Sequence, residues 1–184
     1  MPSIALKTPS ATYDVTGLLW LPPSPNLRTP NALLLYPGIE ILQAAGVSVG
    51  RGTNTPLEIL GAPWAHAREL ADALNQRFIP GVRFVPIRFT PSDSLYKGQL
   101  CEGVSVVIMD RQSLNSTLMG LEIASTLWKL YPDQFAIDRT LELLGSGVTV
   151  QLLKQGTSPE AIMLDWSVDI DAFRVVRAKY LIYR

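Results

Sequence analysis

The run Gly103-Val104-Ser105-Val106-Val107-Ile108-Met109-Asp110 decides the fold class of this chain. It is rich in β-branched residues and short enough to be a buried strand rather than a helix. Earlier in the chain, Val82-Arg83-Phe84-Val85-Pro86-Ile87-Arg88-Phe89 alternates apolar and basic positions in part, which predicts a second strand. Because proline donates no backbone hydrogen bond, Pro86 places this strand at a sheet edge or a bulge. The two runs together predict a small β-sheet.

Helical patterns surround these two runs. Residues 117–131 are apolar on more than one face, which predicts a helix sandwiched between other elements. Thr29 and Pro30 carry the signature of a helix start, and Pro37-Gly38 is expected to stop that helix. The fold is therefore predicted to be α/β, bordering on α+β, with a small mixed sheet flanked by helices. The clearest amphipathic helix spans 63–78 and places on one face Ala67, Leu70, Ala71, Leu74 and Phe78.

Beyond Pro132 the pattern changes to short helical pieces whose start and stop residues stand in the expected places. The last helix, at 170–180, is predicted to turn Phe173, Val176 and Tyr180 inward. We therefore divide the chain into an extended N-terminal arm (1–30), an α/β part that forms a cleft (31–131) and a helical part packed on it (132–184). Together these parts are expected to form one compact unit.

The composition narrows the classes of function. Sixteen basic and sixteen acidic residues give a formal net charge of zero over 184 residues, without a basic block that would follow a phosphate backbone, so nucleic-acid binding is not expected. No apolar run approaches the roughly 20 residues that span a bilayer, and the first seven residues lack the pattern of an export signal. No membrane partner is expected. With Cys101 and His66 as the single residues of their types, an intrachain disulfide is excluded and no metal or other cofactor is indicated.

The stretch 47–64 carries the most distinctive polar chemistry of the chain. Gly50 and Gly52 bracket Arg51, small polar side chains follow, and Trp64 closes the run. Glycine lets a backbone turn tightly or approach a ligand, and the arginine fork suits a carboxylate or a phosphate. The alternative is a structural turn whose arginine is solvated or paired within the chain, since glycines mark turns more often than sites.

Aromatic, amide and charged side chains in this region and in neighbouring loops predict a carbohydrate site. Sugars present apolar ring faces together with hydroxyl edges that need polar partners. Glycoside hydrolysis also requires two carboxylates about 5 to 10 Å apart, for which Glu58 and Glu102 are the loop-adjacent candidates. Each of these residues has a structural alternative as an apolar anchor or a surface charge. The candidate substrate-binding residues are Asn26, Ser48, Arg51, Thr53, Asn54, Trp64 and Arg88.

Several runs of the sequence resemble one bacterial family. Ser48-Val49-Gly50-Arg51-Gly52-Thr53 and Gly61-Ala62-Pro63-Trp64 are similar to runs of the bacterial exo-β-N-acetylmuramidases. These are glycoside hydrolases of peptidoglycan recycling that were long catalogued as a domain of unknown function, and they are commonly extracytoplasmic. Their order and spacing match from about residue 17 to the end, which covers nearly the whole chain. The remaining runs that carry the resemblance are 17–26, 35–38, 81–86, 96–104, 130–132 and 180–183.

The resemblance implies a C-terminal portion rather than a whole enzyme. Family members are about twice as long, and a Rossmann-like N-terminal domain, absent from this chain, supplies much of their catalytic centre. The chain also departs from the family where it reads Leu42-Gln43-Ala44-Ala45-Gly46 instead of a Leu-Glu-Gly-Thr-Asn run. Glutamine cannot act as a proton donor or nucleophile at neutral pH, so any such role of that glutamate is lost.

Three functional hypotheses follow. In the first, the chain is the C-terminal part of an exo-β-N-acetylmuramidase that contributes one side of a site for terminal N-acetylmuramic acid, with Arg51 or Arg88 on its lactyl carboxylate, and it is not hydrolytic alone. In the second, it is a degenerate or split-gene interaction domain that pairs with a separate N-terminal half. An apolar surface near the arm would then serve docking or self-association. In the third, the chain hydrolyses glycosides alone through Glu58 and Glu102.

Overall fold

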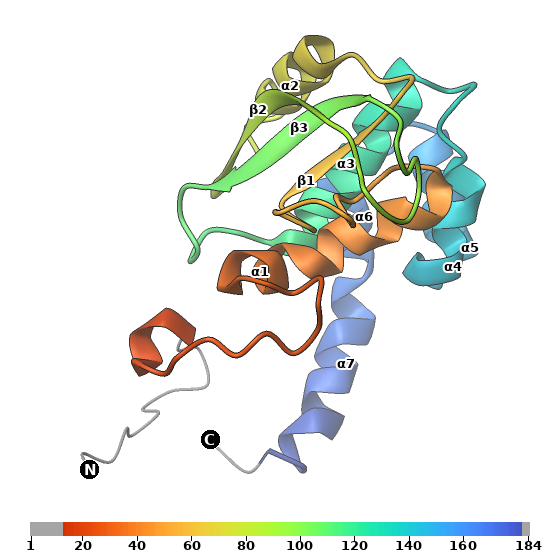
Figure 1. The fold of residues 1–184 in the computed structure, drawn as a ribbon. Helices are drawn as coiled ribbons and strands as arrows, with labels where there is room; N and C mark the ends of the chain where they lie inside the picture. The colour runs from red at the N-terminus through yellow and green to blue at the C-terminus, as the bar shows by residue number, and fades with distance from the viewer. Residues whose placement is uncertain (1–12, 182–184) are drawn as a thin grey trace.

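The computed structural model describes residues 13–181, and its sheet is antiparallel throughout. Within that range three strands, β1 (Ile59–Ala62), β2 (Val82–Phe89) and β3 (Cys101–Ile108), pair in the order β1-β3-β2. The α/β fold class is confirmed, but the sheet is not mixed. An antiparallel pair needs only a loop, whereas a parallel pair needs a crossover of a dozen residues or more, usually a helix. Residues 90–100 between β2 and β3 form such a loop (Figure 1).

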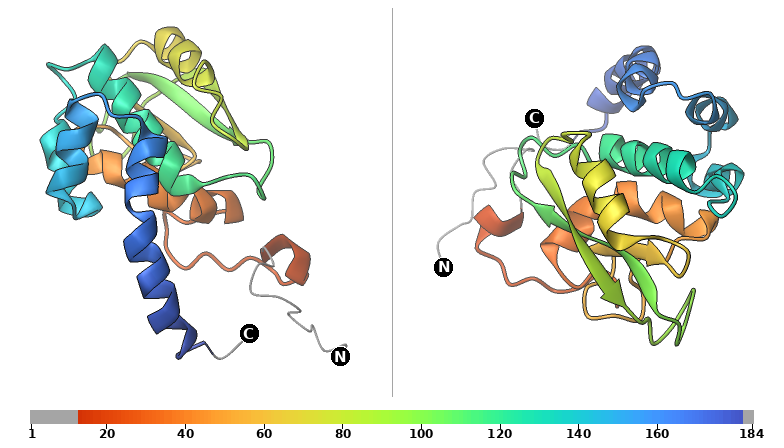
Figure 2. Two further views of the ribbon diagram at one scale, coloured as in Figure 1. Left: turned by 180° about the vertical axis from the view of Figure 1, so that it is seen from behind. Right: turned by 90° about the horizontal axis from the view of Figure 1, so that it is seen from above.

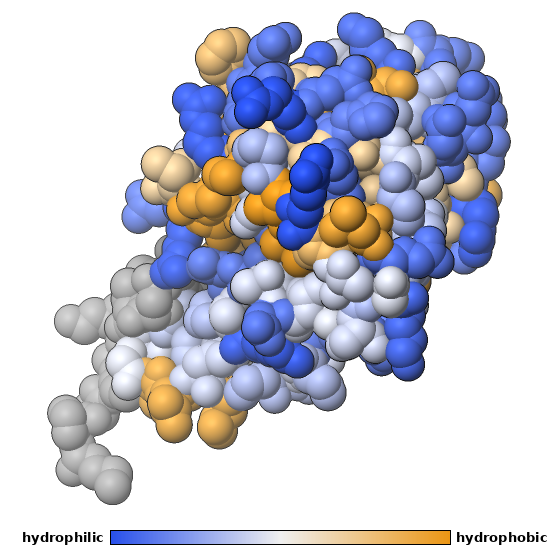
Figure 3. All heavy atoms as spheres, turned by 45° about the horizontal axis from the view of Figure 1, so that its top comes forward, coloured by the Kyte–Doolittle hydropathy of each residue, from blue (hydrophilic) through white to orange (hydrophobic). Residues whose placement is uncertain are grey.

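The two predicted strands form the longest pairing of the sheet. β2 and β3 stay in register from Val82 opposite Ile108 to Phe89 opposite Cys101. Pro86 lies in β2, which is an edge strand, as the missing amide hydrogen predicts. All four residues of β1 are buried, and in the central strand β3 Val104 is fully inaccessible to solvent. Figure 3, with the top of the molecule tilted forward, has an apolar band across its centre, and Val85 of β2 is 46% exposed.

The helix α2 (Ala67–Asn75) packs against β2 and β3 through the predicted residues Leu70, Ala71 and Leu74. The last residue of α2, Asn75, forms hydrogen bonds with the backbone of β2. The Asn75 side chain accepts from the Phe84 amide at 3.0 Å and donates to the Phe84 carbonyl at 2.8 Å. The prediction for Phe78 is wrong, since its side chain is 77% exposed. The helix ends before it, and Phe78 adopts a positive φ of 51° that turns the chain away.

The helix α1 (Pro30–Ile39) begins as predicted, with Thr29 as N-cap and Pro30 in the first turn. It does not stop at Pro37, contrary to the prediction, but continues into the 3₁₀ helix η2 (Glu40–Ala45). A proline inside a helix disrupts local backbone hydrogen bonds. Next to Pro37, the hydroxyl of Ser116 accepts from the Gly38 amide and donates to the Leu35 carbonyl, each at 3.1 Å, and so supplies partners for the backbone of this turn.

The long helix α3 (Ser116–Leu130) lies between the other layers, as its apolar pattern predicts. It contacts α1 and α2 on one side and the short C-terminal helices on the other (Figure 2). Its buried residues include Met119, Leu121 and Ile123, each without exposed surface. The C-terminal pieces are η3 (Ile137–Thr140), α4 (Leu141–Leu144), α5 (Gly147–Lys154) and α6 (Pro159–Asp165).

The last helix, α7 (Ser167–Ala178), projects away from the body of the molecule (Figures 1 and 2). The prediction that Phe173, Val176 and Tyr180 turn inward is wrong. Their exposed fractions are 63%, 49% and 79%, and no residue of α7 is buried. The amphipathic pattern identified the apolar face correctly, but a pattern does not say which surface covers that face.

The arm begins with a short 3₁₀ helix, η1 (Tyr13–Thr16), and continues through the proline-rich segment 17–29. Tyr13 and Trp20 contact edge to face, with ring centroids 4.9 Å apart. Leu18, Leu19 and Leu21 are exposed to 54%, 81% and 75%. The opening residues 1–12 and the end of the 180–183 run lie outside the described residues.

Candidate functional site

The loop after η2 is held in place by backbone contacts with β1 and with the 91–94 segment. Ser48 pairs with Gly61 through two backbone hydrogen bonds of 2.8 and 3.0 Å, and its side chain is buried. Gly52 has a φ of +77°, and a Cβ there would lie 2.3 Å from the Asp93 amide nitrogen. Its carbonyl accepts from the Ser92 backbone at 2.9 Å. The glycine therefore serves a tight contact between two loops.

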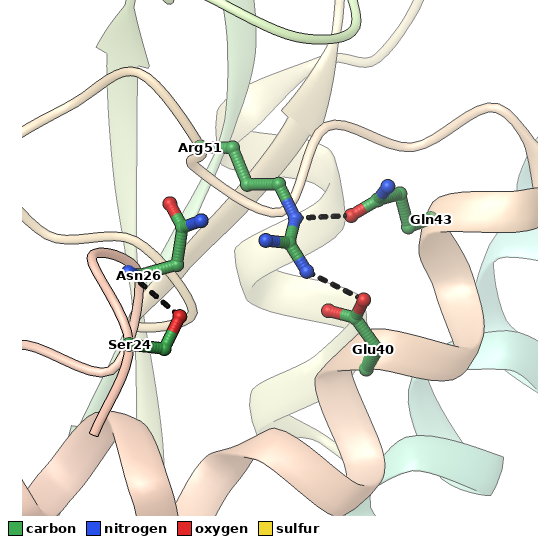
Figure 4. Close-up of polar contacts among 5 residues, drawn as sticks. All are labelled: Ser24, Asn26, Glu40, Gln43 and Arg51. Atoms are coloured by element: carbon green, nitrogen blue, oxygen red, sulfur yellow. Dashed lines mark hydrogen bonds and ion pairs between the residues drawn. The ribbon is translucent and has the colours of Figure 1, made fainter.

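Arg51 is paired within the chain, as the structural alternative predicted. Its Nε donates to Gln43 Oε1 and its Nη2 to Glu40 Oε1, both at 2.6 Å (Figure 4). The side chains of Arg51 and Glu40 are 25% and 16% exposed. Gln43 supplies its acceptor through the side-chain amide oxygen. Glu40 supplies the carboxylate, because residues three apart share one face of the short helix η2.

Asn26 lies opposite this pair. Its backbone amide donates to Ser24 Oγ at 3.4 Å, and in Figure 4 its side-chain amide and the Arg51 guanidinium point toward one space. Glu40 Oε2 is buried and has no hydrogen-bond partner. A buried carboxylate oxygen without a donor is costly, so this corner has an unsatisfied acceptor. We call Ser24, Asn26, Glu40, Gln43 and Arg51 the Arg51 cluster.

Trp64 is half-buried and is linked by hydrogen bonds to the chain that follows η2. Its Nε1 donates to the Tyr96 hydroxyl at 3.1 Å, and that hydroxyl donates to the Gly46 carbonyl at 2.9 Å. The Trp64 ring lies against Tyr131 with centroids 5.3 Å apart. Because Gly46 follows η2 directly, Tyr96 ties Trp64 to the loop that carries Arg51.

Thr53 and Asn54 lie at the tip of the same loop. The Thr53 hydroxyl donates to the Gly50 carbonyl at 2.6 Å and closes the turn. Asn54 is exposed to solvent. Of the seven predicted substrate-binding residues, Asn26 and Arg51 lie close together (Figure 4). Ser48 is buried and pairs with β1 through its backbone.

The two candidate carboxylates are held at opposite ends of β1. Glu102 pairs opposite Ala62, whereas Glu58 directly precedes Ile59. Four residues of strand separate these positions, or about 13 Å along the backbone. Each carboxylate is also engaged by other groups of the chain. Glu58 accepts from the Thr29 hydroxyl at 2.6 Å.

Glu102 is held in its ionised form. Its carboxylate accepts from the Ala67 amide at the start of α2 and from Arg88, and these two hydrogen bonds hold its pKa below the usual value. A carboxyl with a lowered pKa is a poor proton donor at neutral pH. Arg88, whose side chain is 71% exposed, is therefore already paired in the described structure.

Comparison with known proteins assigns this fold to a family. A family model described as "Exo-beta-N-acetylmuramidase NamZ, C-terminal" matches residues 34–183. The chain belongs to the NamZ C-terminal family. The resemblance stated from the sequence is thus confirmed, including its restriction to the C-terminal part. The peptidoglycan beta-N-acetylmuramidase NamZ of Bacillus subtilis (strain 168) is 36% identical over 174 residues, a match that covers 93% of this chain and 42% of that relative.

Solved structures of the DUF1343 family share the fold of this NamZ C-terminal region. A DUF1343 protein from Bacteroides fragilis NCTC 9343 is 31% identical, with a TM-score of 0.83 over 95% of this chain and 48% of that protein. A second one from the same organism, 23% identical with a TM-score of 0.62, shares the fold over 92% of this chain. The chain thus spans less than half the length of these relatives.

The described residues meet the requirements of neither a metal site nor a membrane-spanning helix. Residues 13–181 contain no group of three or more His, Cys, Asp or Glu side chains arranged to hold a metal ion. Over the same range, every helix is too short or too polar to cross a bilayer. Sequence reasoning missed Glu40, whose pairing with Arg51 depends on how the chain turns after η2.

Proposed function

We propose that this domain forms one wall of a binding site for terminal N-acetylmuramic acid and is not hydrolytic alone. The convergence of Asn26, Arg51 and Glu40 in one polar corner, within a NamZ-family chain, carries the proposal. Trp64, tied to that corner through Tyr96, offers an aromatic face of the kind that sugar rings stack on. The catalytic carboxylates would come from the part of the relatives that lies outside the matched region.

The pairing of Arg51 refines which sugar atoms it would bind. Its Nε and Nη2 are used by Gln43 and Glu40, which leaves Nη1 for a ligand. The adjacent Glu40 carboxylate neutralises the charge of Arg51 and would repel the lactyl carboxylate. We therefore assign Nη1 and the Asn26 amide to neutral sugar oxygens, and the Glu40 carboxylate to a hydroxyl or amide hydrogen of the ligand.

The Arg51→Ala variant is expected to bind N-acetylmuramic acid at least about tenfold more weakly than wild type. Loss of a hydrogen bond to a charged group costs about 1.5 kcal/mol or more, which corresponds to that factor. Titration calorimetry at millimolar sugar measures it, supported by the ligand-dependent shift in melting temperature.

Two comparisons make this experiment specific. Arg139→Ala removes an exposed arginine paired with Glu142 and should leave sugar binding unchanged. Arg51→Lys keeps the charge but loses the fork, so it should also bind weakly. If the wild-type chain shows no response to N-acetylmuramic acid, the proposed site does not exist. If Arg139→Ala weakens binding equally, Arg51 is not the residue responsible.

The isolated chain is expected to show no turnover of a chromogenic β-N-acetylmuramide above the buffer rate. The Glu58 carboxylate accepts from the Thr29 hydroxyl, the Glu102 carboxylate accepts from Ala67 and Arg88, and the lowered pKa of Glu102 makes it a poor acid. The measurement compares wild type with Glu58→Gln. Turnover by wild type that disappears in Glu58→Gln would instead support hydrolysis by the chain alone.

A second candidate is a non-enzymatic interaction domain that pairs with a separate N-terminal half. The coverage of the relatives favours it, since the chain matches only 42% of the Bacillus subtilis protein. Exposed apolar residues of the arm also favour it, as the second hypothesis expected. The two candidate functions are compatible, because a domain that pairs with a separate N-terminal half can also form one wall of the sugar-binding site.

A further inference from the structure

A polar groove follows the C-terminal half of α3, between α2 on one side and the α5–α6 connection on the other. Two adjoining hollows of about 380 and 430 Å³ form it, and both are lined by Arg77, Ser125 and Lys129. Seen from above, α3 lies between α2 and the blue C-terminal helices (Figure 2). We call this space the Lys129 groove. Its lining residues come from 73–158, whereas the Arg51 cluster comes from 24–51, so the two sites are separate.

The described side chains that line the Lys129 groove are basic or neutral. They include three cations, Arg77, Lys129 and Lys154, and no Asp or Glu. The chain as a whole carries sixteen residues of each sign, so this balance is local. The carboxylates that pair with two of the cations, Glu122 and Asp138, approach them from outside the groove lining. An anion that enters the groove therefore meets donors and positive charge.

Lys129 is the cation whose charge the described chain leaves uncompensated. Its ammonium group has no ion pair or hydrogen bond within residues 13–181, and the residue is exposed. Lys154 differs, because it donates to both oxygens of Asp138 at 2.9 Å and lies 5.9 Å from the centre of the Trp128 ring. Lys129 is thus the residue on which an anionic ligand would depend most.

Arg77 supplies hydrogen-bond donors rather than net charge. Its Nε donates to Glu122, and Glu160 adds a second carboxylate nearby. The terminal nitrogens of Arg77 have no hydrogen-bond partner in the described part of the chain. Because Arg77 lines both hollows, these nitrogens are available to a ligand where the hollows meet.

A buried hydroxyl without a partner also opens into the groove. Thr126 is 7% exposed and lines the hollow beside α2, and its Oγ1 forms no hydrogen bond within residues 13–181. Buried hydroxyls are normally hydrogen-bonded. Lys129 follows three residues later on the same helix, so the two side chains are neighbours on its surface. The hydroxyl therefore points to an acceptor that comes from outside the chain.

We propose that the Lys129 groove binds a phosphate group. Phosphate is tetrahedral and presents acceptor oxygens in several directions, which suits donors from Lys129 and Thr126 on α3 and from Arg77 across the groove. A planar carboxylate is held best by a free arginine fork, whereas Glu122 already occupies part of the Arg77 fork. Inorganic phosphate, a phosphomonoester and a phosphodiester share this chemistry, and the test distinguishes them.

The test titrates the isotope-labelled full chain with inorganic phosphate, glycerol 3-phosphate and dimethyl phosphate. Ionic strength is held constant, because salt screens exposed charges. The backbone amide signals of residues 125–129 are expected to shift and saturate with at least one of the three, and the order of affinity identifies the source. Succinate, a dianion with planar carboxylates, should bind at least about tenfold more weakly. Absence of a saturable shift in this segment, or equal affinity for succinate, overturns the proposal.

Three variants test whether binding occurs in the groove. Lys129→Ala should weaken phosphate binding at least about tenfold, the factor for a hydrogen bond between charged groups. Thr126→Val keeps the shape but removes the hydroxyl, so binding should weaken between about twofold and tenfold. Its melting temperature should not fall, because that hydroxyl has no partner in the described chain. Lys179→Ala removes an exposed lysine outside the groove and should leave binding unchanged. Equal affinities of Lys129→Ala and wild type, or equal losses in Lys129→Ala and Lys179→Ala, overturn the proposal.

The Lys129 groove can fail without the sugar site, and the reverse. Arg51→Ala should bind phosphate as wild type does, because Arg51 does not line the groove. Lys129→Ala should bind N-acetylmuramic acid as wild type does. A wild-type chain that binds the sugar but not phosphate overturns the groove alone, and one that binds phosphate in residues 125–129 but not the sugar supports it.

Discussion

Gly38→Ala is expected to lower the free energy of unfolding by about 3 kcal/mol, near the upper end of the cost of overpacking a core. A Cβ at Gly38 would lie 2.0 Å from the Ser116 carbonyl oxygen. That neighbour is backbone, so no side-chain rotation relieves the clash. Separating α1 from α3 would also break the hydrogen bonds of Ser116 with the Gly38 amide and the Leu35 carbonyl. Urea denaturation at pH 7 measures the loss.

Gly147→Ala is the matched control for Gly38→Ala. Gly147 begins α5, and a Cβ there would meet nothing within 4 Å. Alanine in an open helical position should change stability by less than about 1 kcal/mol, in the stabilising direction. Equal losses in the two variants would show that the close contact of α1 with α3 has no special cost. Gly120→Ala should resemble Gly38→Ala, because its Cβ would lie 2.5 Å from the Gly38 carbonyl oxygen.

Arg77→Ala is expected to destabilise the chain by about 2 to 3 kcal/mol at pH 7, since it leaves a buried carboxylate without its counter-ion. Glu122 of α3 is 1% exposed and forms an ion pair with Arg77, which follows α2. We set the loss below the full cost of a broken buried pair because the Arg77 side chain is 40% exposed. Glu160 of α6 also faces Glu122 and raises its pKa.

The loss in Arg77→Ala should depend on pH. Burial raises the pKa of Glu122 above its usual value, and Arg77 opposes that rise. Without Arg77 the folded pKa rises further, and the variant loses stability as pH increases from the unfolded pKa, about 4.3, through the folded one. Urea midpoints of wild type and variant should therefore differ strongly at pH 7 and converge near pH 4. Arg174→Ala, which removes an exposed pair with Asp171, should show no loss at either pH. A pH-independent deficit would contradict this account.

The elements that could be predicted are those whose signal is local. The strand at 82–89, the strand predicted at 103–110 and found at 101–108, the capped start of α1 and the inner face of α2 follow from residue pattern alone. β1 (Ile59–Ala62) was not predicted, because four residues with one glycine give too weak an alternation. The hydrogen bonds of Ser116 to the backbone of α1 next to Pro37 join residues far apart in the sequence, and no local pattern reports such a partner.

In the candidate site too, local features could be predicted from the sequence, whereas contacts between distant residues could not. Its residue types and the loop around Arg51 were identified from composition and motif, and the family followed from the order of the runs. The partners of Arg51 could not be predicted, because an ion pair between η2 and the next loop depends on how the chain turns at Gly46. Glu40 was missed for this reason. The exposure of α7 could not be foreseen either, since an amphipathic face looks the same whether it is covered by its own chain or by another part.

At each of the two edge strands, β1 and β2, a different feature limits the backbone hydrogen bonds that another strand could form. Pro86 interrupts the hydrogen-bonding row of β2, and the bridge from Ser48 to Gly61 occupies part of β1. An open edge is a template on which a further strand can add, which is how many proteins begin to form fibrils. Strand addition is therefore disfavoured at the edges of this sheet, and contacts with other molecules are left to side chains.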